Sequence, residues 1–146
     1  MRLVTPRLLI TDDDRDFRET VAGVFAQHGF ETLQAADGAE ALEIVGRHEV
    51  HLLLLDMHMP RLTGLEMIER LRDMPGLRYR DQVSSTAREV ILPLPWILIS
   101  AALDEQLIAR AQAAAAFSVL PKPVRQPELT GAVTGALARA YGWKAA

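Results

Sequence analysis

The chain has 146 residues, of which 49% are apolar and 24% charged, the balance of one ordinary globular domain with its own core. A formal net charge of −3 gives no general attraction to nucleic acid, and the absence of cysteine excludes disulfides and thiolate metal sites. The first residues lack a signal-peptide core and no apolar run approaches the roughly 20 residues that cross a bilayer, so we expect a cytoplasmic protein that does not contact a membrane.

The chain begins with a strand pattern, a helix pattern and a second strand pattern. Residues 6–11 (PRLLIT) are a short apolar run stopped by acids, which indicates a buried strand. The following helix pattern ends near Gly29, and residues 30–36 alternate in the manner of a strand. The apolar face of this first helix consists of Phe17, Val21, Val24 and Phe25.

The middle of the chain repeats this order. Residues 37–49 form a helix pattern with Asp37 as its expected N-cap. Residues 50–56 (VHLLLLD) form the third strand, and their unbroken leucines predict burial on both faces, as in a parallel sheet. Residues 64–73 are again helical.

The last third contains two more strands and two more helices. Residues 74–95 carry prolines, a glycine and polar residues, so we expect a long loop insertion between the third helix and the fourth strand. Residues 96–100 (WILIS) form the fourth strand, 104–116 an alanine-rich helix, 117–120 the fifth strand and 126–141 the last helix.

Five repeats of strand then helix predict a single domain over 1–146 with an α/β fold. Right-handed crossovers give a doubly wound parallel sheet with helices on both faces. Polar residues follow the first, third, fourth and fifth strands, and they converge only if those strands are neighbours. The flavodoxin-like order 2-1-3-4-5, with the second strand at the edge, meets that condition.

The polar groups at the carboxyl ends of the strands form a consistent set. Three acids at 12–14 follow the first strand, Asp56 ends the third, Ser100 ends the fourth, and Lys122 follows the fifth. Clustered carboxylates resist ionisation, and a hard divalent cation such as Mg²⁺ or Mn²⁺ relieves their repulsion. A carboxylate can act as a nucleophile toward phosphorus, while a lysine and a hydroxyl bind phosphate oxygens. The pattern therefore predicts Mg²⁺-dependent phosphorylation of an aspartate.

The sequence resembles the receiver domain of a two-component response regulator. The matching motifs are LLITDDD (8–14), LLLLDMHMPRLTG (52–64), WILISA (96–101) and LPKPV (120–124). Each motif alone is weak, but their combination at these spacings is specific and covers nearly the whole chain.

The resemblance implies roles for the acids and for one backbone carbonyl. Asp56 is the expected phosphoacceptor and a metal ligand. Asp13 is expected to bind the metal directly and Asp12 through water, with the backbone carbonyl of His58 as a further metal ligand. Asp14 is left outside the site, as a helix cap.

The resemblance also implies roles at the ends of the last two strands. Ser100 takes the place of the family's switch serine or threonine, and Lys122, before an expected cis Pro123, contacts the phosphoryl group. Val119 stands where the family often has an aromatic residue. Phe117 is two residues earlier, so its side chain is expected on the same strand face.

The function expected from these observations is signalling. A histidine kinase or a histidine phosphotransfer protein would donate phosphate to Asp56 of a stand-alone receiver, a monomer or weak dimer whose output is contact with a protein target and not with nucleic acid. An alternative is an adapter that keeps the fold but switches without phosphate. A less favoured alternative is an aspartate-nucleophile phosphatase, which typically has a second acid where this chain has His58. The chain is therefore not expected to be a turnover enzyme.

Overall fold

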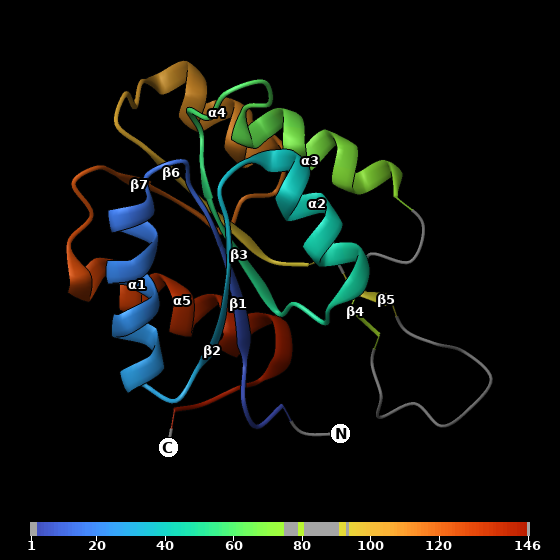
Figure 1. Cartoon of the computed structure of the whole chain (residues 1–146), viewed down its shortest axis with the longest axis vertical. Coiled ribbons are helices and arrows are strands. Elements are labelled where there is room, and N and C mark those ends of the chain that lie inside the picture. The colour runs from blue at the N-terminus through green and yellow to red at the C-terminus, as the bar shows by residue number, and fades with distance from the viewer. Residues whose placement is uncertain (1–2, 75–78, 81–90, 93, 146) are drawn as a thin grey trace.

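The computed structural model describes residues 3–74, 79–80, 91–92 and 94–145. Its main sheet is parallel, with five strands in the order β2-β1-β3-β6-β7 (Figure 1). Because β6 and β7 are the predicted fourth and fifth strands, this is the predicted flavodoxin-like order. The strands are β1 (Arg7–Thr11), β2 (Glu31–Ala35), β3 (Leu52–Asp56), β6 (Trp96–Ser100) and β7 (Ser118–Pro121).

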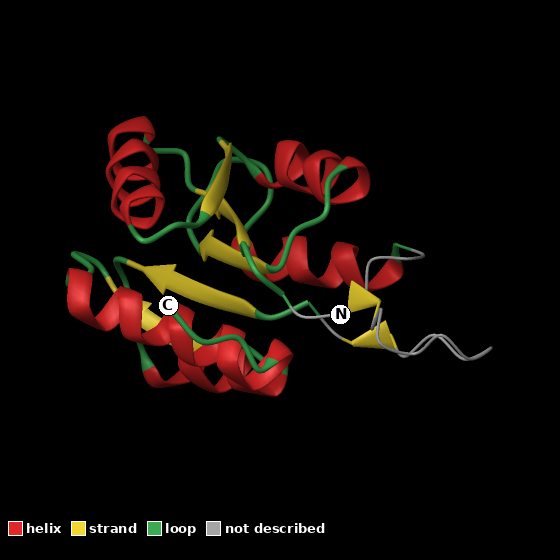
Figure 2. Ribbon diagram, turned by 90° about the horizontal axis from the view of Figure 1, so that it is seen from below, coloured by secondary structure: helices red, strands yellow, loops and turns green. Residues whose placement is uncertain are grey.

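Helices cover both faces of the sheet, which gives the molecule three layers (Figure 2). One face packs against α1 (Arg15–Gln27) and α5 (Gln126–Tyr141). The other packs against α2 (Gly38–Arg47), α3 (Gly64–Asp73) and α4 (Glu105–Ala113). The predicted bounds of α3, β6 and α5 are confirmed, and the other elements differ from prediction by up to three residues at an end.

The leucines of β3 are buried on both faces, as predicted. Leu53 and Leu55 belong to the core layer under α2, α3 and α4, whereas Leu52 and Leu54 belong to the layer under α1 and α5. All four side chains are at most 1% exposed. The strand that ends at Asp56 is therefore the centre of the molecule.

Polar side chains cap the starts of α1, α2, α3 and α4, and each of these helices follows a strand of the sheet at its carboxyl edge. Asp14 accepts hydrogen bonds from the first turn of α1 and Asp37 from that of α2. Thr63 and Glu66 form a reciprocal capping box at the start of α3. The expected cap roles of Asp14 and Asp37 are confirmed.

The segment between α3 and β6 contains regular structure that the sequence did not predict. Strands β4 (Tyr79–Arg80) and β5 (Ile91–Leu92) pair antiparallel in a separate two-stranded sheet. The interpretation of 74–95 as a loop is wrong at these positions, and it missed them because strands of two residues are too short to show an alternating pattern. The middle of this segment lies outside the described residues. Within the described ranges, no helix has both the length and the apolar character that a membrane span requires.

Candidate functional site

Three carboxylates meet at the carboxyl edge of the sheet. Thr11 is paired with Leu55 in the parallel ladder, so the next residues, Asp12 and Asp56, emerge side by side. Oxygens of Asp12, Asp13 and Asp56 all lie within 4.8 Å of one another. Asp12 and Asp56 are buried while Asp13 is exposed, so the group is open to solvent on one side. Three hard oxygen donors with one open side suit a hydrated divalent cation such as Mg²⁺.

Asp12 organises this edge through both of its carboxylate oxygens. Its Oδ1 accepts the backbone N–H of Asp14 at 2.9 Å, and its Oδ2 accepts the Lys122 ammonium at 2.6 Å. The Arg18 guanidinium donates to the backbone carbonyl of Asp12 at 2.7 Å. These contacts hold the loop after β1 in one arrangement.

Lys122 reaches the acids from the loop after β7. Its Nζ lies 2.6 Å from Asp12 Oδ2 and 3.6 Å from Asp56 Oδ1. The same ammonium lies over the Phe17 ring, 4.5 Å from the ring centroid. Burial acts to lower the pKa of Lys122, but the hydrogen bond to Asp12 and the charges of both acids outweigh it, so the pKa is raised. The Lys122–Pro123 bond is cis, as the resemblance implies.

The Asp56 carboxyl has a strongly altered acidity. Burial, followed by the charge of Asp12, raises its pKa to about 6. The charge of Lys122 and a hydrogen bond from the backbone of His58 act in the opposite direction, but they are weaker. A bound cation would supply the positive charge that this carboxylate lacks.

Ser100 lies at the same edge, but its hydroxyl is engaged elsewhere. Ser100 is fully buried, and its Oγ accepts the backbone N–H of Ala102 at 3.1 Å. The Ser100 carbonyl accepts the backbone N–H of Lys122 at 2.9 Å, so a hydrogen bond joins the end of β6 to the loop after β7. Within the described residues, no hydrogen bond joins the Ser100 hydroxyl to Asp56. The side chain of His58 is exposed, and the role expected for its carbonyl oxygen stays a prediction.

The side chains of Phe117 and Val119 lie on opposite faces, contrary to the prediction. Val119 packs with the core layer under α4, while Phe117 packs with the layer under α5. Alternation requires both residues to be in the strand, but β7 begins at Ser118 and Phe117 precedes it. Phe117 closely follows Ala115, whose φ of 68° turns the chain. Phe117 therefore does not replace the aromatic residue that Val119 lacks.

Two residues near the acids were missed by sequence reasoning. Phe17 was assigned to the core face of its helix, and Arg18 was not considered. The signal that could have found them is position, since both lie in the first turns of the helix that follows the acidic pair.

Gly64 packs against the backbone of Asp56 so closely that any side chain at this position would clash with it. A Cβ at Gly64 would lie 2.7 Å from the Asp56 carbonyl oxygen and 3.0 Å from Leu98 Cδ1. The Gly64 N–H donates to the Met57 carbonyl at 3.0 Å. The start of α3 therefore packs directly against the chain at Asp56.

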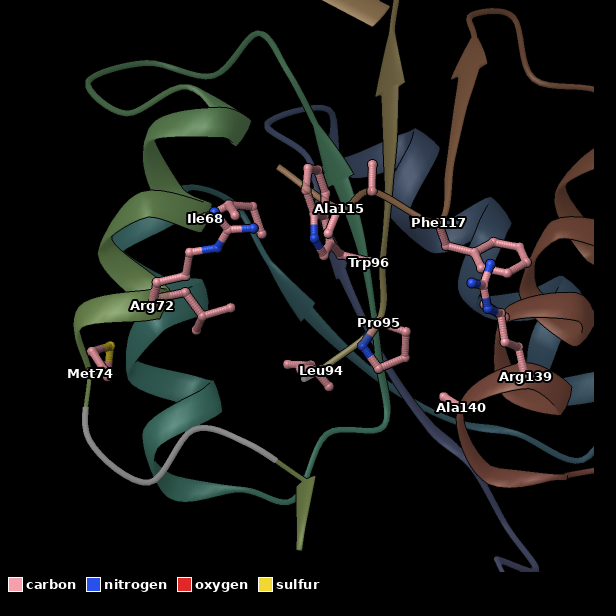
Figure 3. Close-up of a pocket in the computed structure, with 13 residues that line it drawn as sticks. Ile68, Arg72, Met74, Leu94, Pro95, Trp96, Ala115, Phe117, Arg139 and Ala140 are labelled. Atoms are coloured by element: carbon pink, nitrogen blue, oxygen red, sulfur yellow. The ribbon is translucent and has the colours of Figure 1, made fainter. Parts of the chain in front are cut away.

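A second cavity lies at the opposite, amino edge of β6 (Figure 3). It has a volume of about 690 Å³, and its lining includes Leu94, Trp96 and Phe117 with the guanidinium groups of Arg72 and Arg139. Among the lining residues that the structure describes, none has a carboxylate or hydroxyl side chain, so these side chains offer neither a hard oxygen ligand for a metal nor a phosphoacceptor. The acidic edge, which does offer these groups, is therefore the candidate site.

Comparisons with known proteins show which family this chain resembles. A family model described as the response regulator receiver domain matches residues 8–134. The response regulator MprA of Mycobacterium leprae (strain TN) is 39% identical over 119 residues, covering 73% of this chain and 50% of that protein. MprA of Mycobacterium ulcerans (strain Agy99) is 37% identical, with 73% of this chain and 49% of that protein covered. The chain thus spans about half the length of these curated relatives.

Solved structures share the fold at lower identity. The Vibrio cholerae chemotaxis protein CheY4 superposes with a TM-score of 0.74 at 22% identity, covering 92% of this chain and 100% of that chain. A CheY-like receiver domain protein from Methanospirillum hungatei JF-1 gives a TM-score of 0.76 at 21% identity, covering 94% of this chain and 97% of that chain. At these identities the likeness concerns the fold alone.

Proposed function

We propose, because this chain belongs to the response regulator receiver domain family, that its Asp56 carboxylate accepts a phosphoryl group and thereby switches a protein-binding surface. The single observation that carries the assignment is the meeting of the three acids with the Lys122 ammonium at one edge of the sheet. Such domains are signalling domains, and we do not expect sustained turnover.

The chemistry follows from the positions of these groups. An oxygen of Asp56 attacks the phosphorus of a phosphohistidine, the phosphorus–nitrogen bond breaks, and an acyl phosphate forms as the histidine nitrogen leaves and is protonated. The carboxylates of Asp12, Asp13 and Asp56, with the His58 carbonyl, would hold Mg²⁺ or Mn²⁺. When bound, the cation neutralises charge on the phosphoryl oxygens. Lys122, whose Nζ lies 3.6 Å from Asp56 Oδ1, supplies a second positive charge.

Phosphorylation would then redistribute two existing contacts. The phosphoryl group adds about two negative charges beside Lys122, which can leave Asp12 for the new oxygens. The Ser100 hydroxyl can leave the Ala102 N–H and donate to the same oxygens. Ala102 lies between β6 and α4, so this exchange biases the arrangement of that face.

The remaining expectations are parts of the same proposal. The donor is a histidine kinase or a histidine phosphotransfer protein, and the output is contact with a protein target. We place the chain in the cytoplasm as a single receiver domain over 1–146, monomeric or weakly dimeric.

The decisive experiment compares Asp56→Asn with the unchanged chain in acetyl phosphate and Mg²⁺. The unchanged chain should gain the mass of one phosphoryl group in an acid-labile form, and the Asn variant should gain none, because an amide cannot form the acyl phosphate. Asp73→Asn, an exposed acid at the end of α3, is the matched control and should react normally. Equal phosphate uptake by the Asp56→Asn protein would refute the assignment.

Two further measurements separate the alternatives. Beryllofluoride with Mg²⁺ should shift amide signals of β6 and α4, and an unchanged spectrum at saturation would favour a phosphate-independent adapter. Sustained hydrolysis of a generic phosphate ester would favour a phosphatase. The exposed side chain of His58, where a phosphatase has its second acid, argues against that outcome.

A further inference from the structure

We propose that Phe17 is a positioning residue for Lys122. Its ring keeps the Lys122 ammonium beside Asp12 and Asp56 while the ammonium moves from the Asp12 carboxylate to the phosphoryl oxygens. The ring centroid lies 4.5 Å from Lys122 Nζ. The expected effect of Phe17 on the phosphorylation rate rests on the proposed function. The contact between the ring and Lys122 can be tested without phosphorylation.

The ammonium is held by three different groups. Asp12 Oδ2 lies at 2.6 Å, Asp56 Oδ1 at 3.6 Å, and the face of the Phe17 ring covers a further side. The negative face of an aromatic ring attracts a cation, and more strongly where water is partly excluded. The Lys122 side chain is only 21% exposed, so the ring contact is partly desolvated.

The site itself places the Phe17 ring. Asp12 Oδ1 accepts the Asp14 N–H at 2.9 Å, and Asp14 Oδ1 accepts the Phe17 N–H at 3.3 Å. The carboxylate that pairs with Lys122 therefore also orders the turn from which Phe17 projects. A displacement of this turn would move the ring and the ion pair together.

Phosphorylation of Asp56 should change the contact between Lys122 and Asp12, but not the contact between Lys122 and the Phe17 ring. The bond between Lys122 and Asp12 must loosen when Lys122 turns to the phosphoryl oxygens. The ring carries no net charge and offers no oxygen, so it does not compete for the ammonium in the same way. Phe17 can therefore retain Lys122 beside the three acids in both arrangements.

Core packing alone would not need a ring at this position. Phe17 is half-buried and packs against the layer under α1 and α5, where leucine would fill similar space. Phe17→Leu therefore removes the aromatic face with little loss of packing, and Phe17→Tyr keeps it. Phe30→Leu is the matched control, because Phe30 belongs to the same core layer and its ring packs against Trp143.

The geometric test uses the fact that the chain has two lysines, Lys122 and Lys144. Lysine labelled with ¹³C therefore gives two sets of side-chain signals, with exposed Lys144 as the internal reference. The ring current of Phe17 should displace the Lys122 CεH₂ signals. The displacement should disappear in Phe17→Leu, persist in Phe17→Tyr, and persist in Phe30→Leu.

The kinetic test uses phosphorylation by acetyl phosphate with Mg²⁺. Phe17→Leu should lower the rate constant about three- to tenfold, the range expected for a partly desolvated cation–ring contact, and Phe17→Tyr should restore it. In a Lys122→Met background the same Phe17→Leu substitution should have no further effect, because the residue acts through Lys122.

The inference is overturned if the Lys122 signals are the same with phenylalanine and leucine at 17, or if Phe17→Leu slows the reaction equally with and without the ammonium. The second result would indicate a purely structural role. If the unchanged chain gains no phosphate at all, the proposed function fails, and the lysine signals alone still decide whether Phe17 positions Lys122.

Discussion

At the scale of single residues, the Asp56 carboxyl is the group whose environment most clearly opposes its charge. It is 4% exposed and lies beside two other acids, and its pKa is raised to about 6 from an ordinary value of 3.8. Because the folded state binds this proton more strongly than the unfolded state, folding loses stability as the pH rises from about 4 through about 6. The cation-free site is therefore least stable at neutral pH.

Asp56→Asn should raise the free energy of unfolding at about pH 7.5 in EDTA. The pKa shift corresponds to about 3 kcal/mol, which solvent screening at the open side reduces to about 1–2 kcal/mol. The gain should vanish below about pH 4, where both states of the carboxyl are protonated, and should shrink in Mg²⁺, which stabilises only the unchanged chain. Urea denaturation of both proteins across this pH range measures the difference, and a gain that does not vary with pH would contradict the electrostatic cause.

At the scale of elements, the start of α3 is built against the end of β3. Thr63 and Glu66 cap the helix reciprocally, with hydrogen bonds of 2.9 and 3.2 Å. Gly64 follows Thr63, and at this position there is no space for a side chain between α3 and the backbone of Asp56. The position of Asp56 thus depends on how this helix begins.

Gly64→Ala should lower both stability and phosphorylation. A Cβ at 2.7 Å from the Asp56 carbonyl must displace either α3 or the end of β3, at a cost of about 1–3 kcal/mol. Gly23→Ala in α1 is the control, because nothing lies within 4 Å of its Cβ position. That change should stabilise the chain by about 0.5–1 kcal/mol through helix propensity. Thermal unfolding and the rate of acetyl phosphate uptake test both, and equal behaviour of the two variants would contradict the packing argument.

At the scale of the whole molecule, β3 is the only strand of the described main sheet that pairs with both β1 and β6. Its leucines supply the centre of both core layers. The stability of each layer and the position of Asp56 therefore depend on the same five residues.

Leu53→Ala and Leu54→Ala should be similarly destabilising although they face opposite layers. Each side chain is at most 1% exposed, so each truncation should cost about 2–5 kcal/mol of unfolding free energy. Val4→Ala, at a side chain that is 78% exposed, should change stability by less than about 0.5 kcal/mol. Chemical denaturation of the three variants provides the comparison, and a small cost at either leucine would mean that its layer is not closely packed.

The fold could be predicted because its signals are local. The apolar run of 50–56 and the helix pattern of 126–141 each need only neighbouring residues to be recognised. The pairing of β4 with β5 could not be predicted, since strands of two residues carry no periodicity. The face of Phe117 was predicted wrongly because the start of β7 was placed one residue early.

For the candidate site, the sequence predicted which acids and which lysine come together, but not the contacts among them. The strand order places Asp12, Asp56 and Lys122 at one edge, and this much follows from topology. The hydrogen bond from Lys122 to Asp12 joins residues 110 positions apart, and no sequence pattern specifies which acid receives the ammonium. The contact with Phe17 depends on the same long-range packing.

The two ends of β6 have different surroundings. Ser100 closes the strand at the acidic edge, whereas Leu94 and Met74, the described ends of the connection that contains β4 and β5, belong to the cavity at the opposite edge. The whole length of β6 therefore separates that connection from the three acids, and a change in the connection's length need not move them.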